Sequence, residues 1–299
     1  MPPIDNPEPM LRHISDYDEI DCPLQGGEAP YWDEQEQALY FVDMHAPALL
    51  RLDPATGKLN RWTMPDTIGS FGLCLDGRAI VSLRSGLHFF DLATERLELI
   101  AHPEAGRPEN RLNDGKVGPD GRFWVGSMNE SAVRRPEGSL YRVDHDGTCL
   151  RILEGLYTSN GLAWSPNGRL LYHSDSRGKF VQVFDYNLES GSIANGRMLC
   201  TMTEQEGRPD GAAMDCEGFY WSAGVSAGCL NRLSPDGRIV EKIMLPVAAP
   251  SMPCFGGADL KTLYVTSLTS DRLGQAEPGR LISFRVDIAG TPGTRFGRR

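Results

Sequence analysis

Long apolar runs are absent from this sequence of 299 residues. Without a stretch of about 18 apolar residues, we expect no membrane-spanning helix and no membrane partner. Residues 1–21 contain no basic segment followed by an apolar one, which predicts that the protein has no secretory signal and is cytoplasmic. The seven cysteines form no C-x-x-C pair, so we expect reduced thiols instead of a disulfide framework or a structural zinc site.

An excess of basic charge is also missing, because 40 acidic residues oppose 30 basic ones and the net charge is −10. A nucleic-acid partner is therefore excluded, since its phosphates would be repelled over most of the surface. The six histidines show neither H-x-x-x-H nor H-E-x-x-H spacing. Residues 224–228 match the G-x-S-x-G pattern around Ser226, but no helical pattern and no histidine follows it, so we interpret the match as accidental.

Helical periodicity is equally scarce, and what replaces it is a repeated turn. An Asp/Asn/Glu-Gly turn followed by an apolar strand recurs about every 45 residues, with degenerate copies at 31–43 and 257–267. The four clear copies centre on Gly77, Gly121, Gly168 and Gly218. A second polar turn follows each copy after a short interval, as tight hairpins require.

Six such units predict an all-β fold, a six-bladed β-propeller of four-stranded antiparallel blades around a central channel. We expect residues 1–299 to form one propeller domain. An α/β barrel or doubly wound sheet lacks its helices here, and a β-sandwich would leave the repeat unexplained. Residues 10–20 are expected to supply the strand that closes the ring against the last blade.

The innermost strands of a propeller begin around its channel, so residues at equivalent strand starts come together in space. The repeat places six residues there: Glu28, Ser70, Asn113, Asn160, Asp210 and Phe255. Four of them, Glu28, Asn113, Asn160 and Asp210, carry carboxylate or amide oxygens, which suit a hard divalent cation. The alternative is that they only cap strand starts, as Asn and Asp often do.

Two further polar groups lie close to these positions in the sequence. Arg111 precedes Asn113 by two residues and offers a guanidinium for hydroxyls or a carboxylate. Its alternative role is an ion pair with Glu109 or Asp114. His173 and Asp175 share one face of a predicted strand, and we expect them to form a structural pair.

Several stretches resemble the SMP-30/gluconolactonase/luciferin-regenerating-enzyme family, also called regucalcin-like lactonases, over nearly the whole chain. They are GGEAPYWDEQEQALYFVDM, NRLNDGKVGPDGRFWVGSM, TSNGLAWSPNGRLLYHSDS, RPDGAAMDCEGFYWSA and PSMPCFGGADLKTLYVTS. The last two look especially like bacterial sugar lactonases such as xylonolactonase. Where the family usually has E-G-P, this chain has Glu28-Ala29-Pro30, a change that should leave the carboxylate in place.

The resemblance implies one divalent metal in the channel, held by Glu28, Asn160 and Asp210, with Asp210 also acting as the general base. Calcium, zinc, manganese, magnesium and iron(II) all stay open. It assigns substrate binding to Arg111 and Asn113. Many members carry acidic residues after the position of Met128, where this chain has Asn129-Glu130-Ser131. We assign Asn129 to the substrate and leave open whether Glu130 or Ser131 also contacts it.

The resemblance therefore implies hydrolysis of a sugar (aldono-) lactone to its aldonic acid, as in sugar oxidation. The partner is then a small sugar lactone, and the protein is a monomer or a weak homo-oligomer. Two alternatives stay open. One is a metal-dependent lactonase or esterase with a non-sugar substrate, and the other is a non-catalytic calcium-binding propeller.

Overall fold

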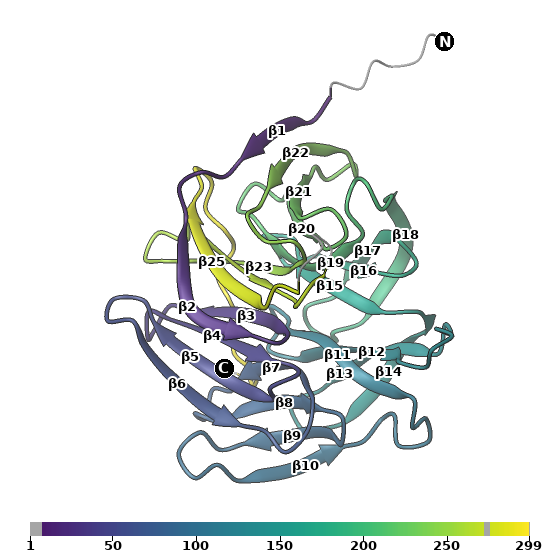
Figure 1. Ribbon diagram of the computed structural model, residues 1–299. Helices are drawn as coiled ribbons and strands as arrows, with labels where there is room; N and C mark the ends of the chain where they lie inside the picture. The colour runs from purple at the N-terminus through teal and green to yellow at the C-terminus, as the bar shows by residue number, and fades with distance from the viewer. Residues whose placement is uncertain (1–7, 272–275, 299) are drawn as a thin grey trace.

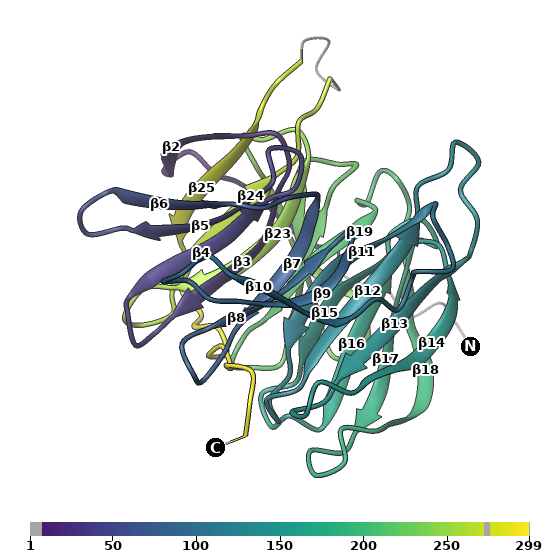
Figure 2. The ribbon, with the colours of Figure 1, turned by 90° about the horizontal axis from the view of Figure 1, so that it is seen from below.

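The computed structural model describes residues 8–271 and 276–298, which contain β-strands and no helix. The strands form six antiparallel sheets arranged in a ring, as Figures 1 and 2 show. The predicted six-bladed β-propeller is therefore confirmed. No helix among these residues is long and apolar enough to cross a membrane.

The first three blades follow one another in sequence order. Blade 1 contains β3 (Gly27–Asp33), β4 (Ala38–Asp43), β5 (Ala48–Asp53) and β6 (Lys58–Thr63). Blade 2 contains β7 (Ile68–Leu73), β8 (Ala79–Leu83), β9 (Gly86–Phe90) and β10 (Leu97–Ala101). Blade 3 contains β11 (Asn110–Val117), β12 (Phe123–Asn129), β13 (Gly138–Val143) and β14 (Cys149–Leu156).

Two of the remaining three blades, blades 5 and 6, each include one N-terminal strand. Blade 4 contains β15 (Ser159–Trp164), β16 (Leu170–Asp175), β17 (Phe180–Tyr186) and β18 (Ile193–Thr201). Blade 5 contains β19 (Pro209–Met214), β20 (Tyr220–Gly224), β21 (Cys229–Leu233), β22 (Ile239–Met244) and, at its edge, β1 (Met10–His13). Blade 6 contains β23 (Pro250–Gly256), β24 (Thr262–Ser267), β25 (Gly279–Arg285) and, outermost, β2 (Asp18–Leu24).

The repeated turn joins the first and second strands of a blade. Its four glycines have φ between 69° and 87°, in the left-handed region that favours glycine: Gly77, Gly121, Gly168 and Gly218. In blade 5 the carboxylate of Asp215 accepts hydrogen bonds from the amides of Glu217 and Phe219, which fixes the turn. These turns lie at the end of the channel opposite the starts of the innermost strands.

Each innermost strand has a β-bulge where it pairs with the second strand of its blade. The register shifts occur near the strand start in all six blades, for example between Glu28 and Tyr31, between Asn160 and Ala163, and between Pro209 and Ala212. A bulge breaks the strict alternation of side chains and aims neighbouring residues toward the same side. The starts of these strands therefore crowd polar side chains into the channel.

The two N-terminal strands pair with different blades, and only β2 closes the ring. β2 pairs antiparallel with β25, with Asp18 opposite Ser283 and Leu24 opposite Gly279. The closing strand is thus Asp18–Leu24, and the prediction of 10–20 was right only for its last residues. β1 instead pairs parallel with β22 of blade 5, where Met10 lies opposite Glu241.

Apolar side chains fill the spaces between neighbouring blades. The sheets form six core clusters, each built from two adjacent blades. Between blades 3 and 4, for example, Trp124 and Leu140 of one sheet pack with Leu162 and Leu171 of the other. Burial of such side chains contributes about 1.5–3 kcal/mol each, so it holds the blades together and makes the channel rigid.

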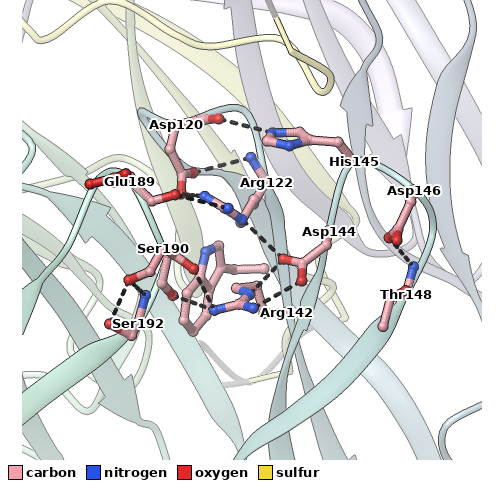
Figure 3. Close-up of polar contacts among 12 residues, drawn as sticks. Asp120, Arg122, Arg142, Asp144, His145, Asp146, Thr148, Glu189, Ser190 and Ser192 are labelled. Atoms are coloured by element: carbon pink, nitrogen blue, oxygen red, sulfur yellow. Dashed lines mark hydrogen bonds and ion pairs between the residues drawn. The ribbon is translucent and has the colours of Figure 1, made fainter.

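A polar network also joins blades 3 and 4 at the turn end of the channel (Figure 3). The Arg142 guanidinium donates to both carboxylate oxygens of Asp144, at 2.7 and 2.9 Å, and to the carbonyls of Ser190 and Gly191. Arg122 contacts the same Asp144 carboxylate at 3.0 Å. These arginines are saturated with partners and hold the β17–β18 turn of blade 4 against blade 3.

The C-terminal segment crosses this same end of the channel. Gly290 forms a bridge with Asp215 of blade 5, and Phe296 forms one with Cys74 of blade 2. A cavity of about 230 Å³ lies beneath residues 291–294 and is walled mainly by aromatic, proline and methionine side chains. The cavity is separate from the polar strand starts at the other end of the channel.

Candidate active site

Asn160 and Asp210 lie in direct contact at the starts of β15 and β19. The Asn160 amide donates to an Asp210 carboxylate oxygen and to the Ser176 hydroxyl, the latter at 3.0 Å. The Ser176 hydroxyl also donates to Asp210, at 3.3 Å. Asn160 and Asp210 are only 3% and 6% exposed. Two of the three predicted metal ligands are therefore adjacent and buried.

Glu28, at the start of β3, faces the same pair across the channel. Burial, together with the negative charges of Asp210 and Asp114, raises the pKa of Glu28 well above its usual range. The next residue, Ala29, has a φ of 49° in the left-handed region, where glycine is favoured. Its backbone N–H donates to the Glu28 carboxylate. The unusual alanine thus keeps the backbone shape that the family glycine implies.

Asp114 is a site residue that the sequence analysis did not assign to this cluster. It is 4% exposed, its Oδ2 accepts a hydrogen bond from the Leu162 amide at 3.3 Å, and its Oδ1 has no hydrogen-bond partner among the residues that the structure describes. Burial raises the pKa of Asp114, while the positive charge of Lys116 opposes the rise. The Lys116 ammonium donates to the Ala212 carbonyl at 2.6 Å. Asp114 therefore adds a third carboxylate to the channel beside Glu28 and Asp210.

Three carboxylates in one buried cluster also affect proton affinity at Asp210. Burial first, and then the charge of Asp114, raise the pKa of Asp210 to about 7, against the smaller opposing effects of Arg208, Ser176 and Arg111. A carboxylate with a pKa near neutrality can both accept and return a proton.

Arg111 and Asn113 form the adjoining wall of the site on β11. The Arg111 guanidinium donates to the Asn113 amide oxygen at 2.6 Å and to the Leu112 carbonyl at 3.0 Å. Its Nε donates to Glu130 at 2.7 Å, so its ion-pair partner is neither Glu109 nor Asp114. The Asn113 amide donates to the Ser159 carbonyl at 3.0 Å. Both side chains lie beside the carboxylate cluster in a fixed orientation.

At the end of β12, Asn129 uses its side chain to bond its own loop and blade. The Asn129 amide donates to Asn110 and Glu137 at 3.1 and 3.0 Å, and its oxygen accepts from Ser131. These contacts hold the loop together, and the contact of Asn129 with the substrate stays a prediction. Glu130 joins this loop to the wall of the site, because it bridges Arg84 and Arg111.

Three other expectations can be compared with the structure. Phe255 lies near the end of β23, and Ser251 occupies the start of that strand, where its hydroxyl donates to the Gly27 carbonyl. The predicted His173–Asp175 pair is wrong: His173 lies between Ser159 at 2.8 Å and Gln182 at 3.0 Å. Ser226 sits in a β20–β21 turn and donates to the Glu204 carbonyl, which confirms that the G-x-S-x-G match is accidental.

Comparison with known proteins identifies the family. Residues 26–269 match the sequence pattern of the SMP-30/Gluconolactonase/LRE-like region. The chain belongs to this family. A 6-deoxy-6-sulfogluconolactonase from Pseudomonas putida is 40% identical over 270 residues, covering 88% of this chain and 92% of that protein. A regucalcin from Xenopus laevis is 34% identical over 246 residues, covering 81% and 82%.

Solved structures of the family agree with this assignment. A luciferin-regenerating enzyme superposes with a TM-score of 0.88 and 28% identity, covering 94% of this chain and 99% of that chain. A gluconolactonase from Xanthomonas campestris gives a TM-score of 0.71 at 22% identity over 88% of each chain, and it supports the fold alone. The resemblance predicted from the sequence is confirmed.

The oxygen ligands at the channel fit a hard divalent cation. Within residues 8–271 and 276–298, no group of three or more His, Cys, Asp or Glu side chains is arranged as a metal site. The ligand set predicted from the sequence combines the carboxylates of Glu28 and Asp210 with the amide oxygen of Asn160. All of these ligands are oxygens, as calcium and magnesium prefer. The unpartnered Asp114 Oδ1 supplies further negative charge nearby.

Proposed function

We propose that this protein hydrolyses a sugar (aldono-) lactone to the corresponding aldonic acid and that it needs one divalent metal ion. The observation that carries the proposal is the contact between Asn160 and Asp210 beside Glu28, within a chain of the gluconolactonase family. The neighbouring Arg111 and Asn113 favour a polyhydroxylated substrate over an apolar ester, because both offer hydrogen-bonding groups.

Glu28, Asn160 and Asp210 would hold the cation. When bound, a divalent cation polarises the lactone carbonyl and stabilises negative charge on its oxygen. It also relieves the repulsion among the buried carboxylates that raises the pKa of Glu28. The identity of the ion stays open, since calcium, magnesium, manganese, iron(II) and zinc all accept oxygen ligands.

Asp210 is proposed as the general base. Its carboxylate takes a proton from the water that adds to the carbonyl carbon, and the C–O bond to the ring oxygen then breaks. Asp210 returns the proton to the departing ring oxygen, which becomes the hydroxyl of the aldonic acid. Water supplies the hydroxyl group of the new carboxylic acid and the proton on the former ring oxygen, so no covalent enzyme intermediate is required.

Arg111 and Asn113 are proposed to bind the sugar hydroxyls. Their mutual hydrogen bond and the Arg111–Glu130 ion pair hold both side chains in one orientation before substrate arrives. A preorganised wall lowers the entropy that must be lost when the ring is positioned next to Asp210.

The experiment is acid release at constant pH from pentono- and hexonolactones, using metal-stripped protein to which single divalent cations are returned. Asp210→Ala should lower kcat by about a hundredfold or more, because the proton acceptor is lost. Asp91→Ala is the matched control and should retain activity, since Asp91 only fixes the β9–β10 turn by accepting from the Ala93 and Thr94 amides. Hydrolysis that is unaffected by Asp210→Ala would overturn the assignment. Cation binding without hydrolysis of any lactone would favour a calcium-binding propeller.

A further inference from the structure

Three arginines surround the opening of the candidate site. The strand register places their loops at the same end of the channel as the carboxylates. Arg177 directly follows Ser176 in the loop after β16, whose end pairs with the start of β15. Arg208 immediately precedes β19, which carries Asp210. Arg134 lies in the loop after β12, and the end of that strand pairs with the start of β11.

Contacts anchor two of these arginines close to the site. The Arg134 guanidinium donates to the Asn129 carbonyl at 2.7 Å. The backbone of Arg208 is fixed from both sides, because its N–H donates to the Ser226 hydroxyl at 2.8 Å and its carbonyl accepts from the Val225 amide. The charge of Arg208 also reaches Asp210, whose pKa it lowers.

Their positive charges are only partly neutralised. Glu204 is shared between Arg208 at 3.6 Å and Lys179 at 3.1 Å. No carboxylate pairs with Arg134 among the residues that the structure describes, and within that same part of the chain Arg177 has neither an ion pair nor a side-chain hydrogen bond. Arg122 and Arg142, by contrast, are saturated with partners, as Figure 3 shows.

The three guanidinium groups also interact with one another. Burial first, and then the positive charges of Arg208 and Arg134, lower the pKa of Arg177, while the charge of Glu204 opposes the fall. An arginine stays protonated at neutral pH, so Arg177 is repelled by two other cations in a protein whose net charge is −10. A bound anion would remove the repulsion and occupy the free hydrogen-bond donors, which form the planar fork that suits sulfonate, phosphate and carboxylate groups.

We propose that Arg134, Arg177 and Arg208 form a subsite for an anionic group on the substrate. This group lies at the end of the substrate that is remote from the lactone carbonyl. The preferred substrates are then acidic sugar lactones that carry a sulfonate, a phosphate or a carboxylate. This inference rests on the proposed lactonase function and extends it to the substrate class. The similarity to a 6-deoxy-6-sulfogluconolactonase is consistent with it.

The test compares gluconolactone with analogues that carry a sulfonate, a phosphate or a carboxylate at the terminal carbon, using metal-loaded full-length protein. The wild type should have the highest kcat/KM for one of the anionic lactones. Arg177→Gln combined with Arg134→Gln should lower the ratio of anionic to neutral kcat/KM by roughly ten- to a hundredfold, since hydrogen bonds to charged groups are lost. The matched control is Arg169→Gln, an exposed arginine at the opposite end of blade 4, and it should leave the ratio unchanged.

The outcomes separate this inference from the proposed function. Equal or better hydrolysis of the neutral lactone, with a ratio that the double variant does not alter, would overturn the anion subsite and leave the lactonase intact. Hydrolysis of no lactone would overturn the proposed function. In that case calorimetric titration with the sulfonated aldonic acid decides the subsite, because binding that the double variant weakens supports it and absence of binding refutes it. The anion giving the highest kcat/KM identifies which acidic group the arginines select.

Discussion

Asp114 illustrates how one irregular position in a strand changes which residues share a site. In a regular strand Asn113 and Asp114 would point to opposite faces. The register shift between Leu112 and Gly115 breaks that alternation, and both residues end up buried at the channel. The spacing of the turn repeat carries no signal of this bulge, so the sequence analysis treated Asp114 only as a possible partner of Arg111.

Asp114→Asn tests the contribution of this carboxylate. The change keeps the size of the side chain and removes one negative charge from the cluster, so we expect the affinity for a divalent cation to fall by about tenfold. Calorimetric titration of metal-stripped protein with calcium measures it. Asp91→Asn is a suitable control, because Asp91 lies in the β9–β10 turn at the other end of the channel. Equal affinities for wild type and Asp114→Asn would show that Asp114 does not act on the cation.

His173 provides a prediction about pH and stability. Burial lowers its pKa to about 3, whereas in the unfolded chain it is near 6.5. Below pH 6.5 the His173 side chain binds a proton in the unfolded state but stays neutral in the folded state. His173 therefore makes the protein less stable as pH falls from 6.5 toward 3. The largest slope from one such group is about 1.4 kcal/mol per pH unit.

His173→Gln should remove this slope, because glutamine does not titrate. Urea unfolding at pH 7, 6 and 5 measures the free energy of unfolding of both proteins. The wild type minus His173→Gln difference in the free energy of unfolding should shrink or reverse as the pH falls. A constant difference over this range would contradict a buried, neutral His173. Using the difference cancels the contributions of the site carboxylates, which titrate in both proteins.

At the scale of elements, the two N-terminal strands differ in how much core they cover. β1 lies at the edge of blade 5, where Met10 and Leu11 are each 61% exposed. β2 is the outer strand of blade 6 and buries Cys22 and Leu24 against blade 1. Only β2 makes the ring continuous.

Removal of residues 1–15 should therefore leave a folded propeller, with a loss of about 1 kcal/mol or a Tm decrease of about 2–4 °C. Removal of residues 1–24 should abolish cooperative unfolding, since the edge of β25 and the core residue Leu281 become exposed. Circular dichroism during heating compares both truncations with the full chain. Similar behaviour of the two truncated proteins would contradict the distinction between β1 and β2.

For the whole molecule, the buried carboxylates predict that cation binding and folding are coupled. A cation that binds only the folded state at a hundred times its Kd adds about 2.7 kcal/mol to the free energy of unfolding. The Tm should then rise by about 5–10 °C. Differential scanning calorimetry with and without chelator measures the shift, which Glu28→Gln should reduce and Asp91→Ala, in the β9–β10 turn, should preserve. An equal shift in Glu28→Gln would argue that the cation binds elsewhere.

Much of the architecture was predictable because it repeats. The turn glycines mark four blades directly, and the predicted start of each innermost strand lies about eight residues before its glycine, which located Asn160 and Asp210. Glu28 was located from the degenerate copy at 31–43 and the family resemblance. Prediction failed where the repeat degenerates: in blade 6 the turn lacks its usual pattern, and Phe255 was aligned where Ser251 stands. Contacts within loops, such as those of Asn129 with Arg134 and Glu137, leave no periodic trace in the sequence.

The pairing of β2 with β25 has a consequence for biosynthesis. Asp18 is synthesised well before its partner Ser283. At roughly 5–20 residues per second, β2 waits on the order of 10 to 60 s for its partner strand. During that time blades 1 to 5 can form in order while blade 6 is incomplete, so the ring closes only after β25 has been made.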